Sequence, residues 1–149
     1  MRPSRILVVL MLLVAPHGVC AQQQAQPLSL TKQCYVPVDP RWTPQEKFVW
    51  KRVCIGNAAN FNKEKGYGGQ LDPKKPDGWP QNRVLRSAFL ETILLTDPYR
   101  RALTRRGVVI IGARFTEAID LEGAELQHRL GLTNSLIEND VDLRRLRSK

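Results

Sequence analysis

The stretch IDLEGAELQHRLGLTNSLI, residues 119–137, decides the fold, because its apolar residues recur in pairs whose members lie two positions apart. Side chains at that spacing point to the same side of an extended chain. A helix would instead need spacings of three and four, and Gly123 and Gly131 would each cost it about 1 kcal/mol relative to alanine. The spacing therefore favours short extended segments, with an amphipathic helix over 116–130 as the alternative.

The pairs continue on both sides of this stretch and repeat every eleven residues. Val108, Ile119 and Leu130 fall in register, and the starts of successive pairs lie alternately five and six residues apart. Four such sides make one turn of 22 residues, so residues one turn apart are expected to stack, with Leu130 over Val108. The residues predicted to point inward are Val108, Ile110, Ala113, Phe115, Ile119, Leu121, Ala124, Leu126, Leu130, Leu132, Ser135, Ile137, Val141 and Leu143.

Two triplets, Ile119-Asp120-Leu121 and Val141-Asp142-Leu143, resemble the repeat unit of the bacterial pentapeptide-repeat proteins. The resemblance covers residues 108–146 and implies a right-handed β-solenoid that, in most members, has no catalytic activity. The preceding RVLRSAFLETILL is similar to the helical cap of some secreted or envelope-associated members. We therefore predict an α+β fold in which N-terminal helices cap a short right-handed β-solenoid of eleven-residue repeats over 108–149.

The first 21 residues have the features of a secretory signal peptide. Arg2 and Arg5 precede an apolar run over residues 6–15, and Ala21 suits cleavage. A membrane span needs about 20 apolar residues and this run has about half that number, so retention as a membrane anchor is the less favoured alternative. Cleavage removes Arg2 and Arg5 from the 23 basic residues and leaves 21 against 14 acidic residues, a net charge of +7. The expected location is the periplasm or the exterior of the cell.

Cys34 and Cys54 are the two cysteines that remain after cleavage. An oxidising compartment favours a disulfide between them, which the chain-entropy relation values at about 3 kcal/mol. The alternative is a free nucleophilic thiol, although no flanking motif supports it. His128 shows no zinc-ligand spacing to either cysteine, so we predict neither a metal site nor a cofactor.

The remainder of the mature chain is expected to consist of a flexible leader over 22–41 and a helical cap region over 42–107. In TPQEKFVWKRVCIGN, Thr43 is a helix N-cap and Glu46 stands three residues later, which together make a capping box. This pattern predicts a helix over 44–55. Apolar residues at helical spacing after Arg83 predict a second helix, and Asp97-Pro98 opens a short third one that ends at Gly107.

Residues 57–82 are rich in Gly, Pro, Asn and Lys and are predicted to form one long loop. Loops longer than about 15 residues are uncommon unless they bind something or move. Four arginines also fall within residues 100–106. The alternative for both groups is a solvated charge run. The candidate basic face consists of Lys63, Lys65, Lys74, Lys75, Arg100, Arg101, Arg105 and Arg106.

These features predict a non-catalytic periplasmic or secreted binding or scaffold module built on the β-solenoid. Its partner would be a protein or an anionic envelope polymer, with a membrane surface as a further candidate and nucleic acid disfavoured. Stacked repeats usually need about three copies, so the final turn either meets another molecule, including a second copy, or belongs to a longer solenoid. The alternative function is a polysaccharide-directed envelope enzyme that uses outward carboxylates, with Asp120 stacked beneath Asp142.

Overall fold

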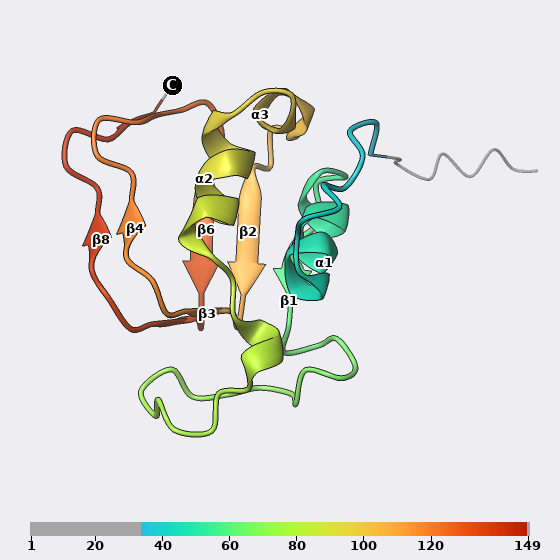
Figure 1. Cartoon of the computed structure of the whole chain (residues 1–149), viewed down its shortest axis with the longest axis vertical. Coiled ribbons are helices and arrows are strands. Elements are labelled where there is room, and N and C mark those ends of the chain that lie inside the picture. Colours follow the sequence, from blue (N-terminus) through green and yellow to red (C-terminus); the bar gives the residue numbers. More distant parts are fainter. Residues whose placement is uncertain (1–33, 149) are drawn as a thin grey trace, which may run out of the picture. The chain divides into compact units, whose positions relative to one another are not determined.

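The computed structural model of the protein describes residues 34–148 (Figure 1). The predicted signal peptide, 1–21, and the leader as far as residue 33 lie outside the described residues. Among the residues that are described, no helix has both the length and the apolar character needed to cross a membrane.

Three α-helices and a short 3-10 helix precede most of the strands along the chain. The elements are, in order, α1 (Pro44–Val53), β1 (Ala59–Asn60), η1 (Gln81–Arg83), α2 (Ser87–Leu95), α3 (Tyr99–Ala102), β2 (Val108–Ile111), β3 (Arg114–Phe115), β4 (Ile119–Asp120), β5 (Glu125–Leu126), β6 (Leu130–Thr133), β7 (Leu136–Ile137), β8 (Val141–Asp142) and β9 (Arg147–Ser148).

Helix α1 begins at the predicted capping box. The Glu46 amide donates a hydrogen bond to Thr43 Oγ1 at 3.3 Å, and the Thr43 amide donates to Glu46 Oε2 at 2.8 Å. These bonds satisfy amide groups that the first turn of a helix leaves without partners. One face of the helix, with Val49, Trp50 and Val53, is fully buried, so the predicted cap and apolar face are confirmed.

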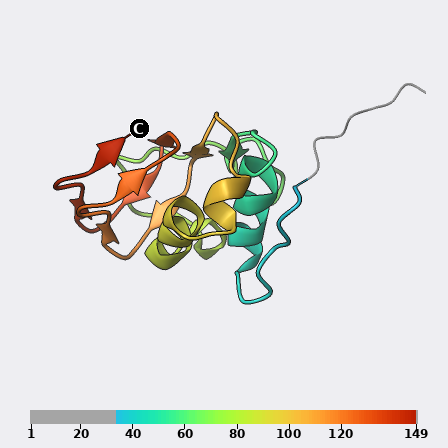
Figure 2. The same ribbon diagram turned by 90° about the horizontal axis from the view of Figure 1, so that it is seen from above.

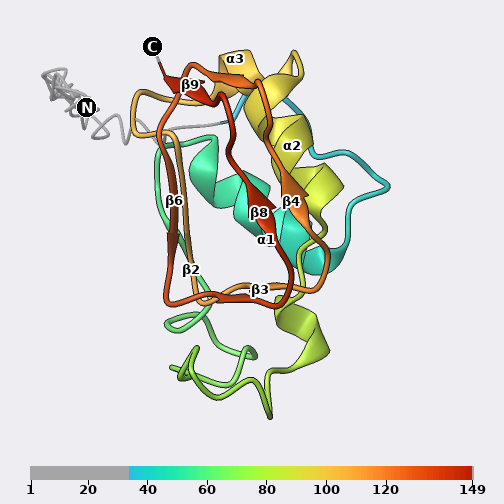
Figure 3. The same cartoon turned by 90° about the vertical axis from the view of Figure 1, so that its left-hand side faces the viewer.

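All the strand pairs are parallel, and most join residues that are 22 positions apart. Val108 pairs with Leu130, Phe115 with Ile137, and Ile119 with Val141. These are the partners that the apolar spacing predicts. Figure 3 shows β2, β3 and β4 following one another around the sides of the molecule, with β6 beside β2 and β8 beside β4.

The fold class predicted from this spacing is nevertheless wrong. The strands do not extend into a right-handed β-solenoid capped by helices; they form one three-stranded sheet, in the order β1-β2-β6, and the two-stranded sheets β3-β7, β4-β8 and β5-β9. The chain passes each side only twice, so each sheet gains a single pair from the repeat. Stacked repeats usually need about three copies for a continuous core. Here the helices supply much of that core instead.

Strand β1 is the third strand of the largest sheet and lies within the segment predicted to be a long loop. Ala59 pairs with Ile110, and the Phe61 amide donates a hydrogen bond to the Ile111 carbonyl at 2.9 Å. Ala59 and Phe61 are completely buried. A two-residue strand is too short to produce an alternating pattern in the sequence, which explains why the loop prediction missed it.

One hydrophobic core joins the helices to the first pass of the strands. Trp50 of α1 and Leu90 of α2 belong to the same buried cluster as Ile110 and Phe115, and Figure 2 shows the helices gathered on one side of the small sheets. The second pass is less covered. Val141 is 39% exposed and Leu143 is 48% exposed, although both were predicted to point inward. The far end of the strand region therefore leaves apolar side chains open to solvent.

Cys34 and Cys54 lie at disulfide-bonding distance, with their Cα atoms 5.5 Å apart. Cys54 directly follows α1, so this pair fixes the segment before the helix against the end of the helix. The Trp50 indole nitrogen adds a second link, because it donates a hydrogen bond to the Val36 carbonyl at 3.1 Å. The part of the predicted flexible leader that is described is thus held against α1.

A buried ion pair connects the start of α1 to the start of α2. Glu46 is completely buried, and its Oε2 accepts a hydrogen bond from Arg86 Nη2 at 2.6 Å. Burial alone raises the pKa of Glu46, but the hydrogen bonds from the Arg86 side chain and the Thr43 amide outweigh it and hold the pKa below its ordinary value of 4.5. Glu46 is therefore ionised in the folded protein.

We expect Arg86→Met to lower the free energy of unfolding at pH 7 by about 3 kcal/mol, because it leaves the buried Glu46 carboxylate without its counter-ion. In the wild type this stabilisation is complete above pH 4.5 and is lost as the pH falls through the depressed pKa of Glu46. The variant should therefore lose less stability than the wild type between pH 6 and pH 3, as measured by urea unfolding. The exposed Arg101→Met is the control and should change stability by less than about 1 kcal/mol.

Candidate functional site

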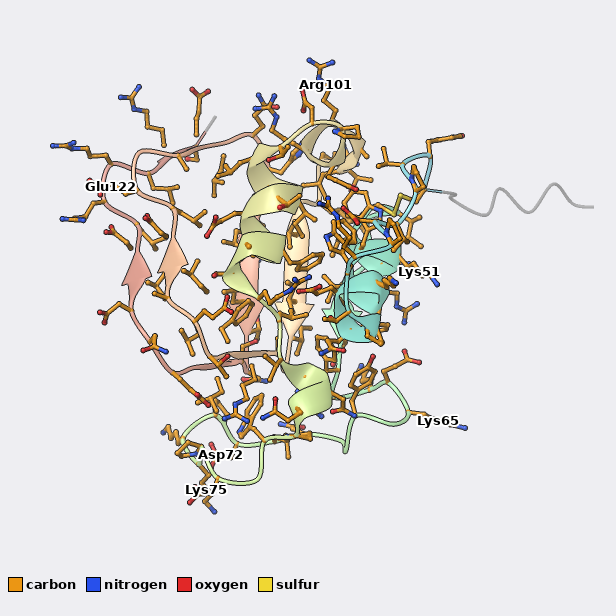
Figure 4. The ribbon with its side chains drawn as sticks, in the orientation of Figure 1. Lys51, Lys65, Asp72, Lys75, Arg101 and Glu122 are labelled. Carbon is orange, nitrogen blue, oxygen red and sulfur yellow. A yellow bond between two sulfur atoms is a disulfide. The ribbon has the colours of Figure 1, made fainter. Side chains whose placement is uncertain are left out.

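The candidate basic face does not form one surface. Figure 4 places Lys65 and Lys75 at one end of the molecule, on the segment before η1, and Arg101 at the opposite end, on α3. Lys63 and Lys74, on the same segment as Lys65 and Lys75, are also exposed. The predicted lysines and arginines therefore belong to two separate regions, of which the arginine region contains a cleft.

Two of the four predicted arginines form salt bridges with the same carboxylate. Arg100 Nε lies 3.2 Å from Asp97 Oδ1, and Arg101 Nε lies 2.9 Å from Asp97 Oδ2. These spacings of three and four residues bring Asp97 within reach of both guanidinium groups. Arg100 and Arg101 are thus less available to an external anion than the two arginines that follow α3.

Arg105 and Arg106 sit on a tight turn between α3 and β2. The Gly107 amide donates a hydrogen bond to the Thr104 carbonyl at 2.8 Å, and the Arg106 amide donates to Thr104 Oγ1 at 3.3 Å. Gly107 has a φ of +68°, a conformation that glycine adopts without the strain of a side chain. The turn is closed by these bonds, while both arginine side chains stay exposed.

The end of α1 approaches this turn closely. A Cβ atom on Gly56 would lie 2.8 Å from Thr104 Oγ1, so glycine allows the two segments to touch. Arg106 Nη1 lies 3.4 Å from the Gly56 carbonyl oxygen and donates a hydrogen bond to it. The backbone around Gly56 thus forms one wall of the arginine region.

Arg129 completes the site from the neighbouring pass of the chain. Its carbonyl oxygen accepts a hydrogen bond from the Val108 amide at 2.8 Å, which places the corner before β6 against Gly107. Its guanidinium lies beside Gly131 and Val109 on the outer side of the sheet, because a Cβ on Gly131 would be 3.9 Å from both Arg129 Nε and Val109 Cγ2. The resulting cleft of about 460 Å³ is lined by Gly56, Asn57, Ala58, Arg105, Arg106, Gly107, Val109 and Arg129.

The three arginines of the cleft, Arg105, Arg106 and Arg129, carry a local positive charge that no carboxylate of the described residues pairs with. Within residues 34–148, none of them forms a salt bridge with a carboxylate. A guanidinium group presents a planar fork of donors that matches carboxylate, phosphate and sulfate oxygens. The cleft is therefore suited to an anionic group, and we call it the arginine cleft.

The outward carboxylates on β4 and β8 are stacked as the register predicts, since Asp120 pairs with Asp142. Arg144 holds this group together: its Nη2 lies 2.6 Å from Asp142 Oδ2 and 3.0 Å from Glu122 Oε2. The hydrogen bond from the Arg144 side chain keeps the pKa of Asp142 below its ordinary value. Asp142 in this state does not donate a proton near neutral pH, and Asp142, Glu122 and Arg144 form a salt-bridge cluster.

Within residues 34–148, no group of three or more His, Cys, Asp or Glu side chains is arranged so that it could bind a metal ion.

Arg129 is the functional candidate that the sequence prediction missed. Arg105 and Arg106 belong to four arginines within a short segment, which is the pattern that predicts a basic face. Arg129 instead has neutral residues on both sides in the sequence. The signal was nevertheless present, because Arg129 stands 22 residues after Gly107 and the same offset aligns the apolar pairs. The same 22-residue register places Arg129 beside Gly107, which directly follows Arg106.

Comparisons with protein-family models, with curated proteins and with solved structures found no match to this chain. The resemblance to pentapeptide-repeat proteins therefore stays a prediction from the sequence.

Proposed function

We propose that the chain is a non-catalytic binding module of the periplasm or the cell exterior that holds an anionic group of an envelope component in the arginine cleft. The observation that carries the proposal is the grouping of Arg105, Arg106 and Arg129 from two passes of the chain without a carboxylate among them in the described part of the chain. Like charges gathered in a concave site repel one another, and a bound anion relieves that repulsion.

The net charge of the mature chain supports the same conclusion. A net charge of +7 attracts polyanions over a distance of about 8 Å at physiological ionic strength, and the cleft then selects groups that accept several guanidinium hydrogen bonds. The cysteine pair at disulfide-bonding distance suits an oxidising compartment, in which anionic polysaccharides and lipid head groups are the abundant anions. An anionic component of the envelope, either a polysaccharide or a lipid, is therefore the partner class that we favour.

The proposal predicts a large effect from neutralising the cleft. The triple variant Arg105→Gln, Arg106→Gln and Arg129→Gln should weaken binding to dextran sulfate at least tenfold, because charge-assisted hydrogen bonds contribute about 1.5–3 kcal/mol each. Binding should be measured by calorimetry at two salt concentrations, and the salt dependence should become shallower in the variant.

The matched control removes the same number of charges elsewhere. Lys63, Lys65 and Lys75 are exposed on the segment before η1, so Lys63→Gln, Lys65→Gln and Lys75→Gln change the net charge equally without touching the cleft. This variant should lose less than threefold in affinity. An equal loss in both triple variants would show that net charge alone binds the polymer, and the cleft would then have no specific role.

A further inference from the structure

A second cavity opens on the other side of the corner that carries Arg129. It has a volume of about 470 Å³ and is lined by Leu126, His128, Arg129, Leu130, Leu143, Leu146 and Ser148. Four of these residues are leucines: Leu126 lies on β5 of the first pass, and Leu130, Leu143 and Leu146 belong to the less covered second pass. Leu126 is buried, Leu130 and Leu146 are half-buried, and Leu143 is 48% exposed. The cavity thus offers an apolar wall that is open to solvent.

Arg129 lines both the apolar cavity and the arginine cleft. Its guanidinium lies over the outer side of the sheet beside Val109, while its neighbour Leu130 lines the cavity. A cationic site and an apolar site therefore meet at a single corner of the chain, residues 127–129. A ligand that reaches around this corner would place a charged end against the arginines and an apolar end against the leucines.

We propose that the ligand is a single-chain anionic amphiphile, with its head group in the arginine cleft and its hydrocarbon chain in the leucine cavity. This assignment rests on the proposed function, because it uses the same arginines, and it adds the chemical class of the ligand. Ligand pockets usually have volumes of about 300–1,000 Å³, and the leucine cavity falls within that range. The cavity is lined by one half-exposed leucine and by leucines that are more deeply buried, which suits a single hydrocarbon chain rather than the surface of a bilayer.

The test compares ligands that share a head group and differ in their chain. The full chain is titrated calorimetrically with ethyl sulfate and with octyl sulfate below its micelle concentration. Octyl sulfate should bind at least tenfold more tightly, since each methylene group that is fully buried adds about fourfold in affinity. Octyl glucoside, which has the same chain and no charge, should bind at least tenfold more weakly than octyl sulfate.

Two apolar side chains on β8 and just after it make a matched pair of variants. Leu143 lines the cavity and Val141 does not, although both are partly exposed. Leu143→Ser should weaken octyl sulfate binding about fivefold and leave ethyl sulfate unchanged, whereas Val141→Ser should leave both within twofold. Because both residues are already exposed, neither change is expected to unfold the protein.

Each possible result supports or contradicts a definite part of the assignment. Equal affinities for ethyl and octyl sulfate, both lost in the triple arginine variant, would reject the amphiphile and keep the anion site. Sulfate binding that is unaffected by the triple arginine variant would reject the proposed function itself. Sedimentation of the protein with phosphatidylglycerol vesicles but not with phosphatidylcholine vesicles, without a chain-length effect, would replace the single-chain ligand by a membrane surface.

Discussion

Gly107→Ala should lower the free energy of unfolding by at least about 4 kcal/mol. Losses of this size are exceptional for single substitutions, and here the cause is a clash between the new methyl group and the backbone of the neighbouring strand. A Cβ at this position would lie 2.7 Å from the Arg129 amide nitrogen, and nearer still to the Arg129 carbonyl oxygen. That oxygen accepts the hydrogen bond from the Val108 amide that begins the pairing of β2 with β6. The methyl group cannot be accommodated by a side-chain rotation, so the two strands must separate.

A second glycine provides the control for backbone strain. Gly123 has a φ of +67°, almost equal to the +68° of Gly107, but a Cβ there would meet no atom within 4 Å. Gly123→Ala should therefore cost only the strain of a left-handed alanine, about 1 kcal/mol. Urea unfolding of both variants measures the difference. Equal losses would mean that the close contact between Gly107 and Arg129 does not exist in solution.

Arg83→Met should destabilise the protein by about 3 kcal/mol and release the segment between β1 and η1. Arg83 is completely buried, and its guanidinium donates hydrogen bonds to the carbonyl oxygens of Tyr67 at 2.7 Å and Gly112 at 3.0 Å. It also donates to the Gly69 carbonyl and to Asn62 Oδ1. Methionine fills similar space but leaves these acceptors without donors, and buried acceptors without donors are costly.

Within the described residues no carboxylate pairs with Arg83, whose hydrogen-bond partners are backbone carbonyl oxygens and the Asn62 amide oxygen. Desolvation lowers its pKa from the ordinary value, although the group stays charged at neutral pH. In the described part of the chain the positive charge is stabilised by these dipoles and by the Trp79 ring, whose centroid lies 5.7 Å from the guanidinium carbon. The loop conformation and the arginine therefore depend on each other.

Limited trypsin digestion distinguishes loop release from general instability. In Arg83→Met, cleavage after Lys63, Lys65 or Lys74 should become faster by about tenfold, while the rest of the chain stays protected under native conditions. Arg52→Met is the control, because Arg52 is exposed and its contact with Glu64 is 3.8 Å long. This variant should change stability by less than about 1 kcal/mol. Unchanged digestion in Arg83→Met would show that the loop is held by other contacts.

The proposed amphiphile would cover part of the exposed end of the strand region. Apolar surface left open on the second pass, at Val141 and Leu143, is otherwise a liability for aggregation. A hydrocarbon chain that covers Leu143 would remove part of that liability in the bound state. Ligand binding is therefore expected to stabilise the folded protein as well as to neutralise the arginine cleft.

The sequence by itself determined features that depend on local order or on a regular period. The capping box at Thr43 needs only residues three positions apart, and the pairing of Val108 with Leu130 is contained in a repeated spacing of apolar residues. Such features are readable because neighbours in the chain are constrained to be neighbours in space.

Only the tertiary structure decided the fold class and the composition of the site. The spacing that predicted the strand partners also predicted a solenoid, and that fold class is wrong. Two passes of the chain give each sheet only one pair of strands from the repeat, and the helices and β1 complete the core. Arg83 binds carbonyl groups 14 to 29 residues away through contacts that follow no period. Arg129 follows the 22-residue offset of the strands, but only the packed turn shows that its side chain joins Arg105 and Arg106. Long-range contacts of single residues leave no repeated signal in the chain, since each is formed once and is favoured only when the rest of the core is in place.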